Sequence, residues 1–168
     1  MKFKPLPSVA RIEELLSYDP ETGIFRWKKY RNARATVGQV AGRFNRGYRL
    51  IMIDYQQYHA SRLAFKVVNA KDPAEEIDHI NGKPFDNRIK NLRESTHAQN
   101  CQNARLRRDN KTKLKGVCRN SSRGKPWLAF IQVNGKQKQI GLFESAEQAH
   151  VAYCEAAHSL HGEFARTE

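Results

Sequence analysis

The chain has 168 residues, enough for one or two small domains, and 39% of them are hydrophobic. Its 30 lysines and arginines outnumber its 17 acids, and the net charge of +13 favours a polyanionic partner, most commonly nucleic acid. No apolar run suits a membrane-spanning helix or a signal peptide, and the basic residues are not gathered on one amphipathic helix, so we expect no membrane association. The three cysteines, Cys101, Cys118 and Cys154, show no metal-binding spacing and suit a reducing compartment.

The first seventy residues are predicted to form small strands between two helices. Residues 8–18 carry apolar side chains at helical spacing, and Ser8 can cap that helix. Further along, strands are expected at 24–28, 37–44, 48–53 and 55–59, and a second helix at 61–68. We expect this strand-rich region to brace the following segment and to present arginines to phosphates, although a solvated basic surface explains any one of them equally well. These arginines are Arg31, Arg34, Arg43, Arg46 and Arg49.

The span 77–103 is predicted to form a strand, a long hairpin loop, a second strand and a helix. Residues 81–82 and 86–87 are typical of turns within that loop. Thr96, followed three residues later by Gln99, indicates the start of the helix. A polar hairpin with chance spacing is the alternative explanation of this span.

Three side chains of this span are suited to phosphodiester chemistry. Asp78 offers a carboxylate oxygen and Asn100 an amide oxygen, which suit Mg²⁺ (or Mn²⁺) better than Zn²⁺. His79 can take up a proton near neutral pH. Neighbouring residues on a strand point to opposite faces, so Asp78 and His79 are expected to flank a phosphodiester. Asn100 falls one turn into the predicted helix, from where it can reach back toward them.

The span resembles the HNH nuclease motif of phage and intron-associated homing endonucleases. The matching segments are 78–82 (DHING), 86–88 (DNR), 91–93 (NLR) and Asn100. The resemblance implies an α+β module of the ββα-metal type in which His79 is the general base. It also implies that Asp78 and Asn100 hold the metal. By the same resemblance, Asn91 holds the hairpin loop and orients His79. Many such proteins carry paired CxxC zinc knuckles, which this chain lacks.

Two arginines near the motif are predicted to contact DNA, Arg62 before it and Arg93 within it. Related HNH proteins often carry a His-Arg-Leu helix just before the motif, and in this chain Ser61 stands at the histidine position. We therefore expect His59 to be structural rather than catalytic.

The last third of the chain is strongly basic and has its own pattern of elements. Between residues 105 and 143 there are eleven lysines or arginines and one acid, which favours nucleic acid more strongly than the global charge does. Strands are predicted at 115–119, 127–133 and 136–143, with a hairpin turn at 134–135. A helix is predicted from Ser145, which forms a capping box with Gln148, to about Gly162.

This part resembles the AP2 DNA-binding domain, a three-stranded antiparallel sheet with one helix. The matching segments are 115–117 (KGV), 127–131 (WLAFI), 140–143 (IGLF) and 145–149 (SAEQA). In such domains the sheet enters the major groove of DNA. The candidate contacts are Lys115, Arg119, Lys125, Trp127, Gln137, Lys138 and Gln139. Trp127 is equally compatible with a place in the core, since aromatic residues in strands usually pack. Cys154, His158 and His161 share one side of the helix, but a structural zinc site would need a fourth ligand.

Together these features predict a small metal-dependent HNH endonuclease that hydrolyses phosphodiester bonds in double-stranded DNA. Residues 1–104 would form the N-terminal brace and the nuclease module, 105–114 a basic linker, and 115–168 the AP2-like domain that sets where cutting occurs. The alternative is a non-catalytic DNA-binding regulator that retains a nuclease fold. The sequence suggests no protein partner, and the resemblance to phage proteins implies the cytoplasm of a bacterial host cell.

Overall fold

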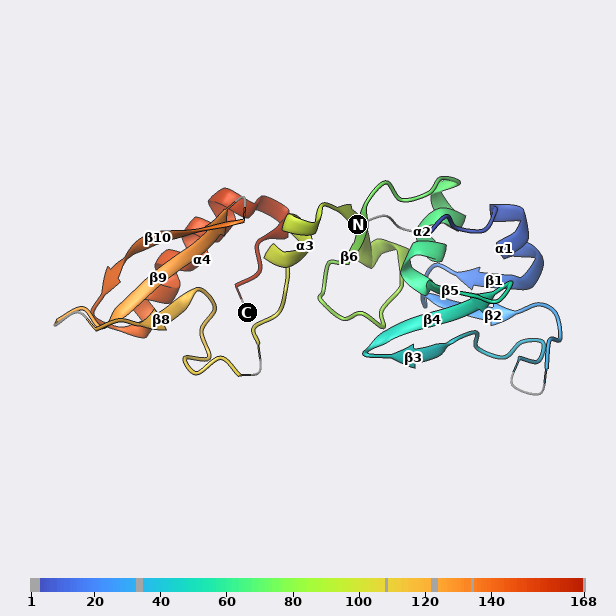
Figure 1. Cartoon of the computed structure of the whole chain (residues 1–168), viewed down its shortest axis with the longest axis horizontal. Helices are drawn as coiled ribbons and strands as arrows, with labels where there is room; N and C mark the ends of the chain where they lie inside the picture. The colour runs from blue at the N-terminus through green and yellow to red at the C-terminus, as the bar shows by residue number, and fades with distance from the viewer. Residues whose placement is uncertain (1–3, 33–34, 108, 122–123, 134, 168) are drawn as a thin grey trace. The chain divides into compact units, whose positions relative to one another are not determined.

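The computed structural model describes residues 4–32, 35–107, 109–121, 124–133 and 135–167, so Arg34 and the first residue of the turn predicted at 134–135 lie outside the described residues. The chain divides into two compact units, the first from residue 1 to 96 and the second from 97 to 168. Both mix helices with small antiparallel sheets (Figure 1). No helix within the described residues is both long and apolar enough to span a membrane.

The first unit begins with a capped helix and a short hairpin. Helix α1 (Val9–Leu15) is capped as predicted, because the Ser8 hydroxyl accepts a hydrogen bond from the backbone N–H of Arg11 (3.1 Å). The helix is shorter than the predicted 8–18, since the chain continues directly into strand β1 (Leu16–Asp19). That strand pairs with β2 (Ile24–Trp27), so residues 16–19 gain sheet hydrogen bonds in place of helical ones.

A three-stranded sheet follows, in the order β3-β4-β5. Its strands are β3 (Arg43–Asn45), β4 (Tyr48–Ile53) and β5 (Gln56–His59). The strand predicted at 37–44 was wrong over most of its length. Gly38 and Gly42 have φ angles of +80° and +87°, which are incompatible with a continuous extended strand.

The rest of the first unit is helix α2 (Ala60–Asn69) and the hairpin of the motif. In that hairpin β6 (Glu76–His79) pairs antiparallel with β7 (Leu92–Ser95), and the short 3₁₀ helix η1 (Ile89–Asn91) ends the loop between them. The core beneath these elements is aliphatic and aromatic. Its largest fully buried side chains are Ile12, Phe25, Ile51, Ile53 and Leu63.

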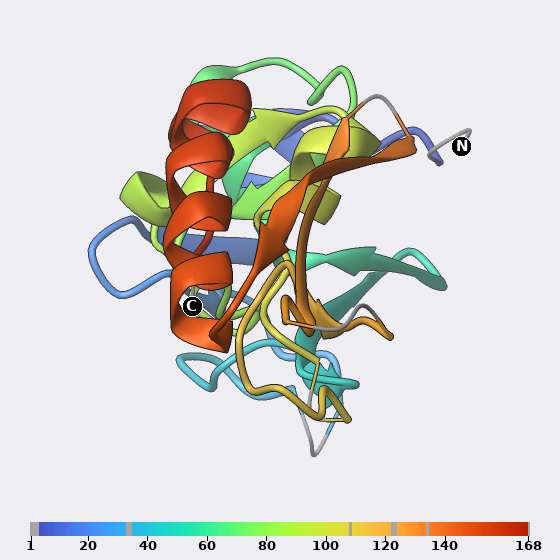
Figure 2. The same ribbon diagram turned by 90° about the vertical axis from the view of Figure 1, so that its left-hand side faces the viewer.

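The second unit opens with α3 (His97–Gln102), the helix predicted at the end of the span 77–103. The predicted strands are found as β8 (Val117–Arg119), β9 (Trp127–Val133) and β10 (Lys136–Phe143), in the order β10-β9-β8. Helix α4 (Ala146–His161) runs along one face of this sheet (Figure 2), and the 3₁₀ helix η2 (Gly162–Phe164) follows it. The predicted capping box of Ser145 and Gln148 is present.

Gly116 is the position where the second unit tolerates a side chain least. Its φ is +72°, and an added Cβ would lie 2.0 Å from Cδ2 of Tyr153. We expect Gly116→Ala to lower the free energy of unfolding by about 2–4 kcal/mol, from the positive φ and the overpacking together. Urea denaturation of Gly124→Ala is the matched control, because Gly124 has a φ of +82° and open space around it. Equal losses in the two variants would contradict the close packing on Tyr153.

Candidate functional site

The motif hairpin places Asp78 and His79 side by side at the end of β6. Both are buried, with exposed fractions of 4% and 6%. In the register of the hairpin, Asp78 lies opposite Arg93 and His79 opposite Leu92. The two side chains therefore belong to adjacent rungs of one antiparallel pair and extend to opposite sides of it.

Asp78 forms an ion pair within this hairpin. Its Oδ2 accepts a hydrogen bond from Nε of Arg93 at 2.9 Å, and both side chains are largely buried. A buried carboxylate is costly unless it is paired and hydrogen-bonded, and the guanidinium supplies such a partner. Arg93, which was predicted to contact DNA, therefore forms an ion pair with the carboxylate that was predicted to hold the metal.

His79 is held by an asparagine of the loop. Its Nε2 lies 3.2 Å from Oδ1 of Asn87, which is 2% exposed. The backbone carbonyl of Asn87 in turn accepts a hydrogen bond from the Tyr18 hydroxyl at 2.7 Å. Because an amide oxygen only accepts, the contact requires a proton on Nε2, which puts the lone pair of the neutral imidazole on Nδ1.

The surroundings of His79 favour its neutral form. Burial lowers the pKa of His79 below its usual value, while the hydrogen bond that His79 donates to Asn87 and the charge of Asp78 oppose that change. A neutral imidazole is the form that accepts a proton from water.

Asn91 closes the loop between the two strands. Its Oδ1 accepts from the backbone N–H of Asn81 (3.0 Å), and its Nδ2 donates to Asn81 Oδ1 (3.1 Å) and to the backbone carbonyl of Asp86 (2.8 Å). The asparagine side chain that contacts His79 is that of Asn87, so the orienting role of Asn91 stays a prediction.

The β1–β2 turn packs against the same loop from outside. A Cβ added to Gly23 would lie 2.4 Å from the backbone nitrogen of Arg88, so the turn touches the loop backbone directly. Nearby, the backbone N–H of Ile89 donates to the carbonyl of Pro20 at 3.3 Å. These contacts fix the loop that carries Asn87, and through Asn87 they restrain His79.

Asp86 makes the loop sensitive to acid. Its carboxylate accepts from Arg88 Nε (2.8 Å), Arg88 Nη2 (2.6 Å) and Asn81 Nδ2 (2.7 Å), and these partners lower its pKa to about 2, with Arg88 contributing most. A carboxyl whose pKa is lower in the folded state adds stability above pH 4, and this stability is lost as the pH falls toward 2.

We therefore expect Asp86→Asn to be destabilised by on the order of 1 kcal/mol at pH 7 and to match the parent chain near pH 2. Denaturant unfolding at both pH values measures the difference. A loss that is the same at pH 2 as at pH 7 would show that the charge of Asp86 does not stabilise the loop.

The predicted metal ligands fall in different units. Asp78 belongs to the first unit, and Asn100 lies on α3 of the second. Across the described residues, no three His, Cys, Asp or Glu side chains gather into a metal-holding group. Carboxylate and amide oxygens are ligands of the type that hard cations prefer, and the assignment of Asp78 and Asn100 as metal ligands stays a prediction.

The Tyr48 ring of the β3–β4–β5 sheet contacts His79 and also the ring of His59. The Tyr48 ring meets His79 at 6.2 Å and His59 at 5.2 Å between ring centroids, both edge-to-face. Burial lowers the pKa of His59, and the positive charge of Arg62 and the electrostatic interaction with His79 lower it further. His59, expected to be structural, therefore lies in the surroundings of His79.

The guanidinium of Arg62, a predicted DNA contact, forms hydrogen bonds to two backbone carbonyls. Its Nη1 donates to the carbonyl of Glu75 and its Nη2 to that of Pro73 (3.4 Å). Arg62 therefore ties α2 to the segment that leads into β6.

The strand register settles on which face of the second unit's sheet its candidate DNA contacts lie. Ile131 packs on α4, and Lys138 is its cross-strand partner, so Lys138 extends from the helix side. Gln139 pairs with Phe130 and Gln137 with Gln132, which places both glutamines on the opposite face.

The other candidates of this unit differ in their surroundings. Trp127 packs against the core cluster around Val117 and Ala129, and the Arg119 guanidinium lies 5.3 Å from the centroid of its ring. Lys125 is exposed.

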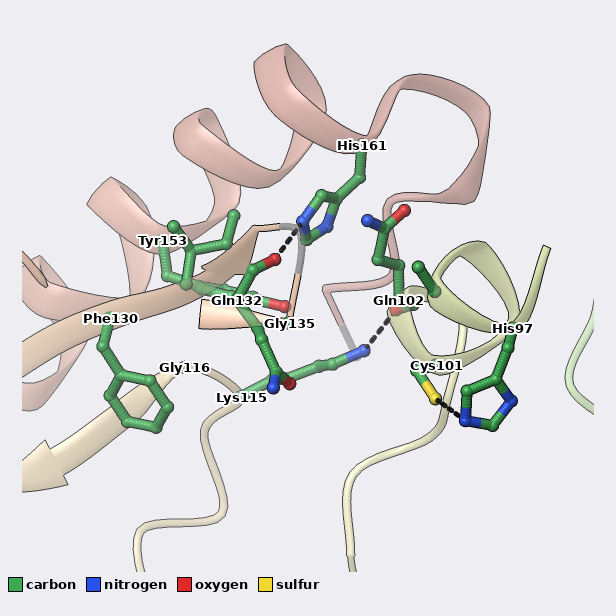
Figure 3. Close-up of a pocket in the computed structure, with 12 residues that line it drawn as sticks. His97, Cys101, Gln102, Lys115, Gly116, Phe130, Gln132, Gly135, Tyr153 and His161 are labelled. Carbon is green, nitrogen blue, oxygen red and sulfur yellow. Dashed lines mark hydrogen bonds between the residues drawn. The ribbon is translucent and has the colours of Figure 1, made fainter. Parts of the chain in front are cut away.

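Lys115 lies in a cavity of about 370 Å³ in the second unit (Figure 3). Its Nζ donates to the backbone carbonyls of Gln102 (2.9 Å), the last residue of α3, and of Ala104 (2.6 Å), two residues beyond it. Burial, aided by the charge of Arg166, lowers the pKa of Lys115 to about 8. The ammonium predicted to contact DNA thus binds the end of α3.

Two of the three side chains considered for zinc, Cys154 and His161, have other partners. Nε2 of His161 lies 3.0 Å from the backbone carbonyl of Gln132, and Cys154 Sγ lies 3.6 Å from Nε2 of His150. These contacts direct Cys154 and His161 to different partners.

Sequence reasoning missed Asn87 and Tyr48 as neighbours of His79. The available signal for Asn87 was its place in the turn at 86–87 and in the DNR segment of the motif. No sequence pattern indicated Tyr48, because its contact with His79 joins strands of two different sheets.

Comparison with known proteins supports the motif. A family model described as HNH endonuclease matches residues 58–102. Protein 3.8 of Escherichia phage T7 is 31% identical over 90 residues, which are 54% of this chain and 73% of that protein. The chain therefore belongs to the same family as Protein 3.8 of Escherichia phage T7, and it carries an HNH endonuclease domain at residues 58–102.

Proposed function

We propose that the chain is a metal-dependent endonuclease that hydrolyses phosphodiester bonds in double-stranded DNA. The observation that carries this proposal is His79, a buried histidine with a lowered pKa, which is fixed through Nε2 by Asn87 and follows Asp78 on β6. The net charge of +13 favours the polyanionic substrate.

In the proposed reaction, His79 takes a proton from water through Nδ1. The water oxygen bonds to phosphorus, the bond from phosphorus to the 3′ oxygen breaks, and that oxygen leaves and takes up a proton. A divalent cation held by Asp78 and Asn100 would, when bound, stabilise the charge on the phosphate and on the departing oxygen. Asn87 keeps the imidazole oriented, and its anchor Tyr18 keeps Asn87 in place.

Plasmid cleavage by the full chain tests this proposal. Supercoiled DNA should become nicked or linear with Mg²⁺ or Mn²⁺, remain intact with EDTA, and be cut again when the metal is restored. Full cutting after exhaustive chelation would refute the metal dependence. Binding without cutting in both metals would instead favour a non-catalytic DNA-binding regulator.

We further propose that the sheet of the second unit acts as an AP2-like module and sets where cutting occurs. Gln139 extends from the face opposite α4 and can meet base edges, whereas its neighbour Lys138 extends from the helix side.

Gln139→Ala should therefore change the preference among sites by roughly 5–100-fold. If Lys138 contacts a phosphate, Lys138→Ala should weaken binding to all sequences alike. It should also lower the salt slope, which is the slope of the logarithm of the binding constant against the logarithm of the salt concentration, by about 1. Salt titrations on matched and scrambled duplexes measure both effects. An unchanged preference in Gln139→Ala would contradict base contact by this residue.

A further inference from the structure

The β3–β4–β5 sheet of the first unit has one buried and one open face. Ile51 and Ile53 of β4 are fully buried in the core that they share with Leu63 of α2. Met52, between them, is 46% exposed, as expected for a residue that points the other way. Figure 1 shows α2 lying over β4 and β5. The helix thus covers the Ile51 side of the sheet, and the Met52 side is its open face.

The register identifies the side chains of this open face. Gln57 pairs with Met52, His59 and Arg43 both pair with Leu50, and cross-strand partners share a face. Asn45 pairs with Tyr48, two residues before Leu50 on the same strand, and so belongs to the same face. The exposed members are Arg43, Asn45, Tyr48, Met52, Gln57 and His59.

The open face runs up to the candidate catalytic histidine. Tyr48, 42% exposed, contacts the rings of both His59 and His79. At the β3–β4 turn, a Cβ added to Gly47 would lie 3.3 Å from Cγ of Pro84 in the motif loop. The open face is therefore continuous with the surroundings of His79, and a ligand lying on it would extend to them.

The chemistry of this face suits nucleic acid. Strands β3, β4 and β5 contain no aspartate or glutamate, and Arg43 adds a positive charge. Asn45 and Gln57 carry amide groups, which can both donate to and accept from base edges, and arginine pairs well with phosphate. Antiparallel strands of this size also fit a DNA groove.

We infer that the open face of the β3–β4–β5 sheet docks the DNA segment that adjoins the cleaved bond. Arg43 contacts phosphate, Asn45 and Gln57 contact base edges, and Tyr48 with His59 joins the face to the site of His79. The inference rests on the proposed function only in taking DNA as the substrate. It gives the first unit its own local DNA contact, in addition to the module of the second unit.

Two neighbouring glutamines allow a charge-matched test. Gln56 and Gln57 are both exposed on β5, but Gln56 pairs with Ile53 and so lies toward the opposite face. Gln57→Glu and Gln56→Glu change the net charge equally, so long-range electrostatics affect both alike. Fluorescence anisotropy of the full chain with a labelled duplex in EDTA measures binding without cleavage.

Gln57→Glu should weaken binding by about tenfold, because the new charge meets DNA, and Gln56→Glu by less than about twofold. As a second variant, Arg43→Ala should lower the salt slope by about 1. Equal losses in the two glutamate variants, or an unchanged salt slope in Arg43→Ala, would overturn the inference.

Measuring binding and cleavage separately distinguishes a failure of this inference from a failure of the proposed function. If the parent chain does not cut in Mg²⁺ but Gln57→Glu loses affinity selectively, the nuclease proposal fails and the docking face stands. If the parent chain cuts and the two glutamate variants bind alike, the docking face fails and the nuclease proposal stands.

Discussion

His79→Ala should lower the rate of DNA cleavage by about 10²–10⁴-fold and leave DNA affinity nearly unchanged. The imidazole takes a proton only as the bond to phosphorus forms, so its removal affects the transition state and not the bound ground state. The geometry supports this separation of rate from affinity, because His79 is buried, contacts the Tyr48 ring and is held by Asn87.

Single-turnover cleavage at saturating protein, together with anisotropy on the same duplex, separates the rate from the affinity. His158→Ala is a suitable control, since His158 is an exposed histidine of α4 in the second unit. A His79→Ala variant that cuts as fast as the parent would exclude His79 as the base.

Loss of either proposed metal ligand is the second large effect. We expect Asn100→Ala to slow cleavage by about 100-fold or more and to raise the Mg²⁺ concentration for half-maximal activity, because one oxygen ligand is removed. A Mg²⁺ titration of the cleavage rate measures both quantities. Gln99→Ala, which changes a partly buried neighbouring amide of α3, is the control.

Asp78 needs a gentler substitution than Asn100. Asp78→Ala would leave Arg93 buried without its carboxylate, which costs about 3–5 kcal/mol and mixes unfolding with lost activity. Asp78→Asn keeps an oxygen acceptor for Nε of Arg93 and removes the charge that binds a cation. Wild-type rates and wild-type Mg²⁺ dependence in both Asn100→Ala and Asp78→Asn would contradict the assignment of the ligands.

Local patterns predicted many elements of this chain well. Strands β9 and β10 begin and end at the predicted residues, and α4 carries the predicted capping box, because alternation and capping depend on neighbours in sequence. The strand expected at 37–44 failed for a local reason too, since the positive φ angles of Gly38 and Gly42 bend the chain there.

The surroundings of the candidate site depend on contacts that no local pattern encodes. His79 could be singled out by its motif, but its contact with Tyr48 needs β4 and β6 to be folded together. The ion pair of Arg93 with Asp78 follows from the register of β6 and β7, which only the hairpin sets. Arginine is typical of DNA contacts and of buried ion pairs alike, so sequence could not tell these uses apart.

Binding and cutting of one labelled duplex, measured in parallel, test the nuclease proposal most directly. The full chain is examined with Mg²⁺, with EDTA, and as His79→Ala with Mg²⁺. We expect the duplex to be bound in all three samples and cut only in the first. Binding without cutting by the parent chain in Mg²⁺ and in Mn²⁺, or cutting by His79→Ala at the parental rate, would contradict a metal-dependent nuclease that uses His79 as its base.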